Sequence, residues 1–187
     1  MPAQGVTTVP IHRLDTDTYN RIVESGALEG QPVELINGLL VEHMSPQGPE
    51  HTAIVMRLSR HFANAEGWLM VQLPLEVPPD SEPEPDLALI EQEPSPERHA
   101  RTALLVAEVS VSTHKLDRGS KAELYARAGI DSYWLVDVPA KTVEVRTQPT
   151  PEGYLRCTDY GIDELVPSPV AGVVDLDVGT LLAGVGA

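Results

Sequence analysis

Two carboxylates stand beside short apolar runs, where an acid is costly to bury. Glu108 follows the apolar run 103–107 (ALLVA), and Asp86 directly precedes the run 87–90 (LALI). A carboxylate in such surroundings is stable only if it is paired, hydrogen-bonded or bound to a cation. Mg²⁺ usually takes one or two protein carboxylates together with waters and substrate phosphates. The sequence therefore predicts a divalent-metal site at Asp86 and Glu108, at the ends of neighbouring strands.

Lys121 is the third candidate, on a predicted helix that follows Glu108. It shares one helix face with Asp117 and Tyr125, which lie four residues before and after it. Simpler roles stay open for each candidate. Glu108 could form a salt bridge at the end of the sheet, Asp86 could cap a turn, and Lys121 could form a solvated ion pair with Asp117.

Charge is segregated along the chain, although the net charge is −15. Residues 76–97 contain eight acidic residues and no basic one, whereas residues 114–127 contain Lys115, Arg118, Lys121 and Arg127. An overall negative charge argues against nonspecific binding of polyanions over the whole surface, but it does not exclude a local site. One segment could hold a cation while the other faces a phosphate backbone.

The first half of the chain must carry Asp86 into position. We expect a helix at 16–27, with Asp15 or Thr16 as its N-cap, and a hairpin of strands 33–36 and 39–41. Asn37-Gly38 between those apolar runs is a strong hairpin signal, because both turn positions need positive φ. A second helix at 50–65 and a strand at 68–77 follow. The proline-rich segment 78–86 should be an exposed loop that leads to the strand 87–90.

The second half must carry Glu108 and Lys121. The apolar run 103–109 is typical of a central strand that is covered on both faces, and alternation places Val106, Glu108 and Ser110 on one face. A third helix is expected at 115–128. Further strands are expected at 133–136, 142–146 and 154–158, and residues 172–184 should close the edge of the sheet. The predicted fold class is α/β (α+β), with a central mixed β-sheet flanked by helices.

Composition bounds the class of protein. A chain of 187 residues with 42% apolar residues fits one globular domain (1–187) without disulfide staples. The single cysteine, Cys157, excludes an internal disulfide and favours a reducing compartment. No apolar stretch approaches the roughly 20 residues that cross a bilayer, and the first residues lack the pattern of a secretion signal. We expect a cytoplasmic protein without a membrane segment.

Several strings together resemble a known family. The chain resembles the Uma-two family of bacterial proteins in five strings. These are PEPDLALI, the long block LLVAEVSVSTHKLDRGSKAELYARAGIDSYWLVD, the opening VELINGLLVEHMSPQGPEH, and the later VEVRTQ and GYLR. That family belongs to the PD-(D/E)XK superfamily of restriction-endonuclease-like nucleases. The resemblance covers residues 14–182, and it is the combination of motifs that makes it specific.

The resemblance implies a site as well as a fold. Asp86 and Glu108 would hold Mg²⁺ or Mn²⁺, and a water would attack a phosphodiester of DNA. The superfamily lysine normally lies two residues after the second acid, where this chain has Ser110. In this family the lysine usually comes from the next helix instead, and Lys121 matches that position. Glu34 matches an additional acidic residue near the metal, with a cross-strand pair in the hairpin as the alternative.

Two further expectations rest on the same resemblance. His51 matches a family position on the second helix, where a surface or capping role is the alternative. The family also implies a homodimer.

Two functions of different classes remain open, with a variant of the first. The leading hypothesis is a metal-dependent endonuclease that acts on DNA. The alternative is a noncatalytic dimeric binding or regulatory protein that keeps the nuclease fold, favoured by Ser110 and the acidic surface. A metal-dependent hydrolase of a small phosphate ester would use the same residues as the endonuclease.

Overall fold

The computed structural model describes residues 10–42, 48–111 and 116–185. Its elements, in chain order, are α1 (Thr16–Glu24), β1 (Val33–Ile36), β2 (Leu39–Glu42), α2 (Pro49–His61), β3 (Trp68–Met70), β4 (Leu87–Ile90), β5 (Leu105–Ser110), the π-helical segment η1 (Asp117–Lys121), α4 (Ala122–Arg127), β6 (Ser132–Asp137), β7 (Thr142–Thr150), β8 (Gly153–Tyr160), β9 (Leu165–Val166), β10 (Leu176–Asp177) and α5 (Val178–Leu181). No helix in these ranges is long and apolar enough to cross a membrane.

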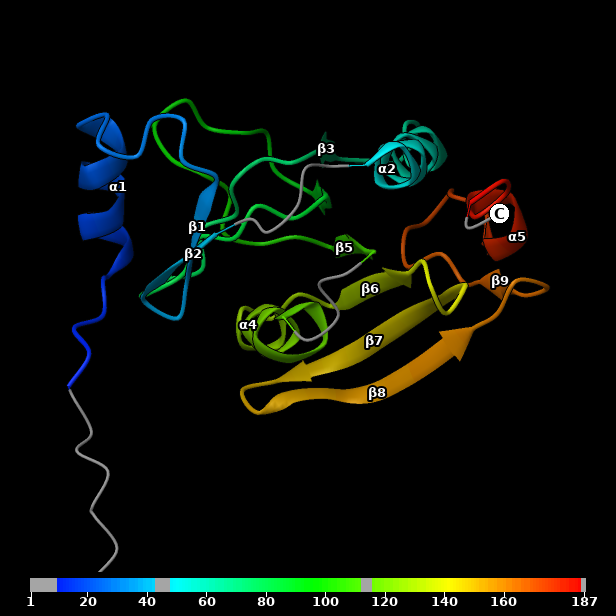
Figure 1. Cartoon of the computed structure of the whole chain (residues 1–187). Coiled ribbons are helices and arrows are strands. Elements are labelled where there is room, and N and C mark those ends of the chain that lie inside the picture. Colours follow the sequence, from blue (N-terminus) through cyan, green and yellow to red (C-terminus); the bar gives the residue numbers. More distant parts are fainter. Residues whose placement is uncertain (1–9, 43–47, 112–115, 186–187) are drawn as a thin grey trace, which may run out of the picture.

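A six-stranded mixed sheet is the centre of the fold (Figure 1). Its strand order is β3-β4-β5-β6-β7-β8. Only β5 and β6 pair in parallel, and the other neighbours are antiparallel. A parallel pair needs a crossover connection, and η1 with α4 supplies it. The predicted fold class, with a central mixed sheet flanked by helices, is confirmed.

Both faces of the sheet are buried, and side-chain alternation sorts the core into two layers. Leu105, Ala107 and Val109 of β5 pack with α2 and the C-terminal segment. Val106 packs on the opposite face, in a cluster that includes Tyr125 of α4. Continuous apolar strands suit this arrangement, since each face has a cover. Glu108 continues the series begun by Val106 and so faces the crossover helix.

Local sequence signals in the first half of the chain hold in the structure. Asp15 caps α1 by accepting a hydrogen bond from the Thr18 amide. The hairpin turn has φ of 49° at Asn37 and 77° at Gly38, which confirms the predicted turn. Helix α1 ends earlier than expected, at Glu24 instead of residue 27. Likewise α2 ends at His61 instead of residue 65.

Two expectations for the segment before Asp86 are wrong. The strand predicted at 68–77 is regular only over β3, and beyond it the chain forms single bridges such as Leu75 with Ala100. The loop predicted to be exposed is instead buried from Ser81 onward. Its backbone is satisfied by other segments, since the Glu82 amide donates to the Leu35 carbonyl at 2.7 Å. Prolines stop this segment from joining a ladder, but they do not keep it in solvent.

The C-terminal segment does not close an edge of the central sheet as predicted. Instead, β10 pairs with β9 in a separate two-stranded sheet. The segment packs beside α2, where Arg57 Nη1 donates to the Leu181 carbonyl at 2.7 Å. The third predicted helix corresponds to η1 and α4, and its predicted first residue, Lys115, lies outside the described residues.

Candidate active site

Asp86 lies immediately before β4 and is held by three donors from separate parts of the chain. The pairing of Leu87 with Ala107 brings it beside the Glu108 end of β5. The Val109 amide donates to Oδ2 at 2.8 Å, and Gln72 Nε2 donates to Oδ1 at 3.3 Å. His51 Nε2, from the first turn of α2, lies 3.0 Å from both carboxylate oxygens. The carboxylate is therefore fixed in orientation, and Asp86 is only 5% exposed.

These donors also set the charge of Asp86. Burial alone would raise the pKa of this carboxyl group. The hydrogen bond and charge of His51, together with the Val109 amide and Gln72, outweigh burial and lower its pKa. Asp86 is therefore an ionised carboxylate in a nearly dry setting.

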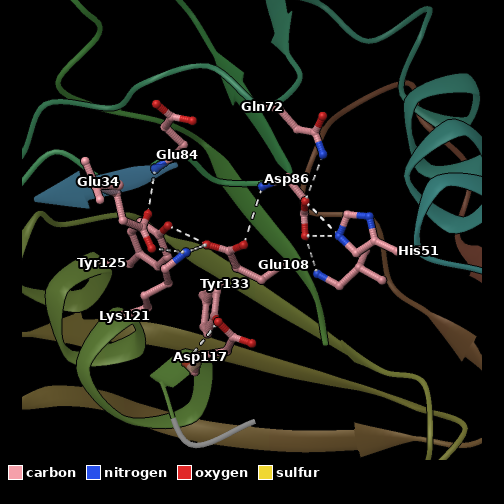
Figure 2. Close-up of polar contacts among 12 residues, drawn as sticks. Glu34, His51, Gln72, Glu84, Asp86, Glu108, Asp117, Lys121, Tyr125 and Tyr133 are labelled. Carbon is pink, nitrogen blue, oxygen red and sulfur yellow. Dashed lines mark hydrogen bonds and ion pairs between the residues drawn. The ribbon is translucent and has the colours of Figure 1, made fainter. Parts of the chain in front are cut away.

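Glu108 approaches Asp86 from β5 and is held by the crossover helix (Figure 2). Its Oε1 accepts hydrogen bonds from the Tyr125 hydroxyl at 2.7 Å and from Lys121 Nζ at 3.1 Å. Its Oε2 accepts a longer hydrogen bond, 3.4 Å, from the Asp86 amide. Each acid thus contacts the backbone of the other's strand, because Asp86 accepts from Val109. The two predicted metal ligands are neighbours.

The pKa of Glu108 is raised to about 8 in the absence of a cation. Burial is the largest cause, and the charges of Asp86, Asp117 and Glu34 add to it, while Lys121 opposes them. The same surroundings raise the pKa of Tyr125, mainly through burial and then through Glu108. Tyr125 therefore remains a hydroxyl and donates to Glu108 Oε1.

Lys121 sits between Glu108 and Glu34, and its ammonium is not solvated. Nζ lies 3.1 Å from Oε1 of each carboxylate, and the residue is 2% exposed. Burial lowers the pKa of this ammonium, but Glu108, Glu34 and Asp117 outweigh burial and raise it. Lys121 thus contacts Glu108 in a buried position, and a solvated pair with Asp117 is not its environment.

Glu34 connects the hairpin to this cluster. It lies on β1, is 2% exposed, and accepts a hydrogen bond from the Glu84 amide at 3.0 Å through Oε2. One carboxylate thereby holds both the ammonium of Lys121 and the loop that leads to Asp86. Glu34 is not merely a cross-strand partner in the hairpin.

The donor set suits a hard divalent cation. Carboxylates outnumber Lys121 in this buried region, and their mutual repulsion is one cause of the raised pKa of Glu108. A carboxylate has about four lone-pair positions, so the three donors on Asp86 leave about one for a cation. No group of three or more His, Cys, Asp or Glu side chains in the described ranges could hold a metal ion. Two carboxylates would supply only part of the coordination of a cation such as Mg²⁺ or Mn²⁺, and waters or phosphate oxygens would complete it.

Three residues that hold the acids were missed or given weaker roles at the sequence level. His51 lies on α2, where a surface or capping role is the simpler expectation, yet its ring contacts Asp86. Gln72 lies in the irregular segment after β3, and no pattern in the sequence marks it. The contact of Tyr125 with Glu108 could have been found, since Tyr125 follows Lys121 by one helical turn.

The predicted basic face is largely engaged within the chain. Arg118 donates to Asp137 at 2.9 Å and to Glu144 at 3.0 Å. Arg127 lies 3.4 Å from Asp80. Lys115, the third member of that face, is outside the described residues. Fewer free cations than expected can therefore be assigned to a phosphate backbone.

The chain is similar to proteins that are described as putative nucleases. The sequence model of the Uma2 family, described as "Putative restriction endonuclease", matches residues 17–179. No curated protein matches the chain. A crystal structure of a "putative nuclease belonging to DUF820" from Anabaena variabilis is similar in fold, with a TM-score of 0.65 and 19% identity over 81% of this chain and 89% of that one. Because the family match spans most of the sequence, the chain belongs to the Uma2 family of putative restriction endonucleases.

Proposed function

We propose that this protein is a metal-dependent endonuclease that hydrolyses phosphodiester bonds in DNA, with Mg²⁺ or Mn²⁺ held by Asp86 and Glu108. The observation that carries the proposal is the buried meeting of these two acids with Lys121 in a chain of a nuclease family. Such a cluster is costly to bury, and a structural core would be more stable with apolar residues in its place.

Each residue has a distinct task in this proposal. Asp86 and Glu108 bind the cation, which when bound lowers the pKa of a water and neutralises charge on phosphoryl oxygens. Lys121 places a fixed positive charge beside Glu108, where it can stabilise charge that develops on the phosphate. Glu34 holds Lys121 in that position, and Tyr125 orients Glu108.

A second candidate function is a noncatalytic dimeric binding or regulatory protein that retains the nuclease fold. Two observations favour it: Ser110 stands at the usual lysine position, and Arg118 and Arg127 form ion pairs within the chain. The same test of activity separates the two candidates.

The first experiment is a plasmid-nicking assay with Mg²⁺ or Mn²⁺, with and without EDTA. We expect nicking by the wild type, none in EDTA, and none by Asp86→Asn, which keeps the size of the side chain but loses the charge that a cation needs. Isothermal titration with Mn²⁺ should show binding to the wild type and not to this variant. Equal nicking by both proteins would reveal a contaminating nuclease. Absence of cleavage across DNA, RNA and small phosphate esters, with Mn²⁺ still bound, would favour the noncatalytic candidate.

The proposal includes a cytoplasmic location and a homodimer. The cytoplasmic location is supported by the single cysteine, which suits a reducing compartment. The homodimer is supported by the family resemblance. Light scattering coupled to gel filtration should give a mass of about 40 kDa, twice that of one 20.2 kDa chain, as expected for a two-fold assembly. A mass near that of one chain would contradict the dimer without bearing on the nuclease site.

A further inference from the structure

Asp86 and Glu108 are held in different ways. The donors that hold Glu108 include a full positive charge, the ammonium of Lys121. Two of the donors that hold Asp86 are neutral: the Val109 amide and the carboxamide of Gln72. The third is the imidazole of His51, which spans both oxygens at 3.0 Å. The orientation of Asp86 therefore depends strongly on two side chains that belong to neither the acid pair nor the lysine.

The backbone at Gln72 adds a second observation. Gln72 has φ of 52°, in the left-handed region that residues other than glycine rarely adopt. In that conformation its amide donates to the Asp86 carbonyl at 3.3 Å, while its side chain reaches Oδ1 of the same residue. Unusual backbone conformations of this kind tend to occur at functional sites, because surrounding contacts must maintain them. Gln72 therefore hydrogen-bonds Asp86 through both its main chain and its side chain.

His51 reaches Asp86 from another direction (Figure 2). It lies in the first turn of α2, and its side chain is 13% exposed. Helix α2 packs on the sheet through apolar residues such as Ile54 and Leu58, both fully buried. The imidazole is therefore presented by a rigid element. Its contact joins α2 to the start of β4, where the candidate site lies.

We infer that His51 and Gln72 are positioning residues, which fix the Asp86 carboxylate in the orientation that cation binding requires. The inference rests on the proposed function and deepens it. Groups that hydrogen-bond a metal ligand orient that ligand, and their removal typically weakens metal affinity by about 10–100-fold. His51 carries the larger effect, because its contact is shorter and spans both oxygens, whereas Gln72 contacts one oxygen at 3.3 Å.

A matched pair of substitutions tests His51. In His51→Gln the side-chain amide nitrogen can reach the position of Nε2, whereas the amide of His51→Asn is too short to do so. Isothermal titration should show Mn²⁺ binding weakened about 10–100-fold in His51→Asn and largely restored in His51→Gln. Gln72→Ala should weaken it less. His61→Gln, which changes the other histidine of α2, should bind Mn²⁺ like the wild type. Equal Mn²⁺ affinity in His51→Asn and the wild type would overturn the inference.

A second readout needs no metal. The Val109 amide donates to Asp86 Oδ2, so its nitrogen-15 NMR signal in metal-free protein reports the orientation of that carboxylate. The signal is assigned as the one that disappears from its position in Val109→Ile. It should move in His51→Asn and stay near the wild-type position in His51→Gln. If wild type binds no Mn²⁺ but the signal moves as expected, the proposed metal site fails while the positioning role stands. If the signal is the same in both variants and the wild type, the positioning role is wrong whatever the metal does.

Discussion

Lys121 is the residue on which the electrostatics of the site depend most. It is a buried cation between Glu108 and Glu34, and its ammonium contacts both at 3.1 Å. Removing one member of a buried ion pair leaves an uncompensated charge, which costs more than the pair itself contributes. Substitution of Lys121 therefore changes stability as well as rate, and the two effects must be measured separately.

We predict that Lys121→Met lowers the free energy of unfolding by about 3–5 kcal/mol in metal-free protein, because it leaves the buried Glu34 carboxylate without its cation and removes the positive charge that opposes the raised pKa of Glu108. Adding Glu34→Gln should recover part of the loss. Urea denaturation measures both, and Lys141→Met, which changes an exposed lysine, should stay within about 0.5 kcal/mol of the wild type. Wild-type stability in Lys121→Met would contradict the role assigned to this ammonium.

A second prediction concerns Tyr125→Phe, which removes the 2.7 Å hydrogen bond to Glu108 and little else. Glu108 is buried, so losing this donor should cost about 1–3 kcal/mol of unfolding free energy. Tyr19→Phe is the control, because the Tyr19 hydroxyl makes only a 3.3 Å contact to the Val33 carbonyl and should cost less. Equal costs in urea denaturation would mean that the Tyr125 hydroxyl contributes nothing specific to Glu108.

At the residue scale, the sequence was informative wherever a charge interrupts an apolar pattern. Glu108 stands out in its strand, and Asp86 stands out before its own, so both could be predicted as buried acids that need a partner. Their supporting residues could not be predicted in the same way. Gln72 is a polar residue in an irregular segment, and only the folded chain brings it to Asp86. The residues that hydrogen-bond the acids of a site come from distant parts of the chain, and no periodic pattern in the sequence marks them.

At the element scale, the β1–β2 hairpin organises the approach to the site. Its turn contacts the N-terminal segment, since the Leu14 amide donates to the Gly38 carbonyl at 3.0 Å. Its first strand carries Glu34, which holds the loop before Asp86 through the Glu84 amide. The hairpin itself was predictable from Asn-Gly. Its packing over the proline-rich loop was not, because prolines restrict the local backbone but do not indicate which segments pack together in the fold.

Two glycines with the same φ of 77° allow a matched test of this hairpin. At Gly38 a Cβ would lie 2.6 Å from Arg13 Cβ, whereas at Gly26 nothing lies within 4 Å. We predict that Gly26→Ala costs about 1–2 kcal/mol for the left-handed backbone alone, and that Gly38→Ala costs about 1–3 kcal/mol more for overpacking. Thermal or urea unfolding compares the two. Equal costs would show that the N-terminal segment does not pack tightly on the turn.

At the scale of the whole molecule, charge would limit how the proposed DNA substrate is bound. The net charge is −15, and the guanidinium groups of Arg118 and Arg127 are paired with acids of the same chain. Nonspecific DNA binding comes almost entirely from cations that neutralise phosphates. Under the proposed function, a bound divalent cation would therefore provide much of the attraction for phosphate, because these two arginines are already paired.

We therefore predict weak DNA binding in EDTA, where no cleavage is expected. Fluorescence anisotropy of a labelled duplex should give a Kd above about 10⁻⁴ M at physiological salt, and a shallow slope of log K against log salt, because few phosphates are neutralised. Asp80→Asn removes the acid beside Arg127, and freeing that guanidinium should steepen the slope by about one unit. Asp131→Asn, which removes an equal charge from an exposed position away from Arg127, should change the slope less. Micromolar binding with a steep slope in EDTA would instead reveal an extended basic surface, and DNA would then be held by side chains and not mainly through the site's cation.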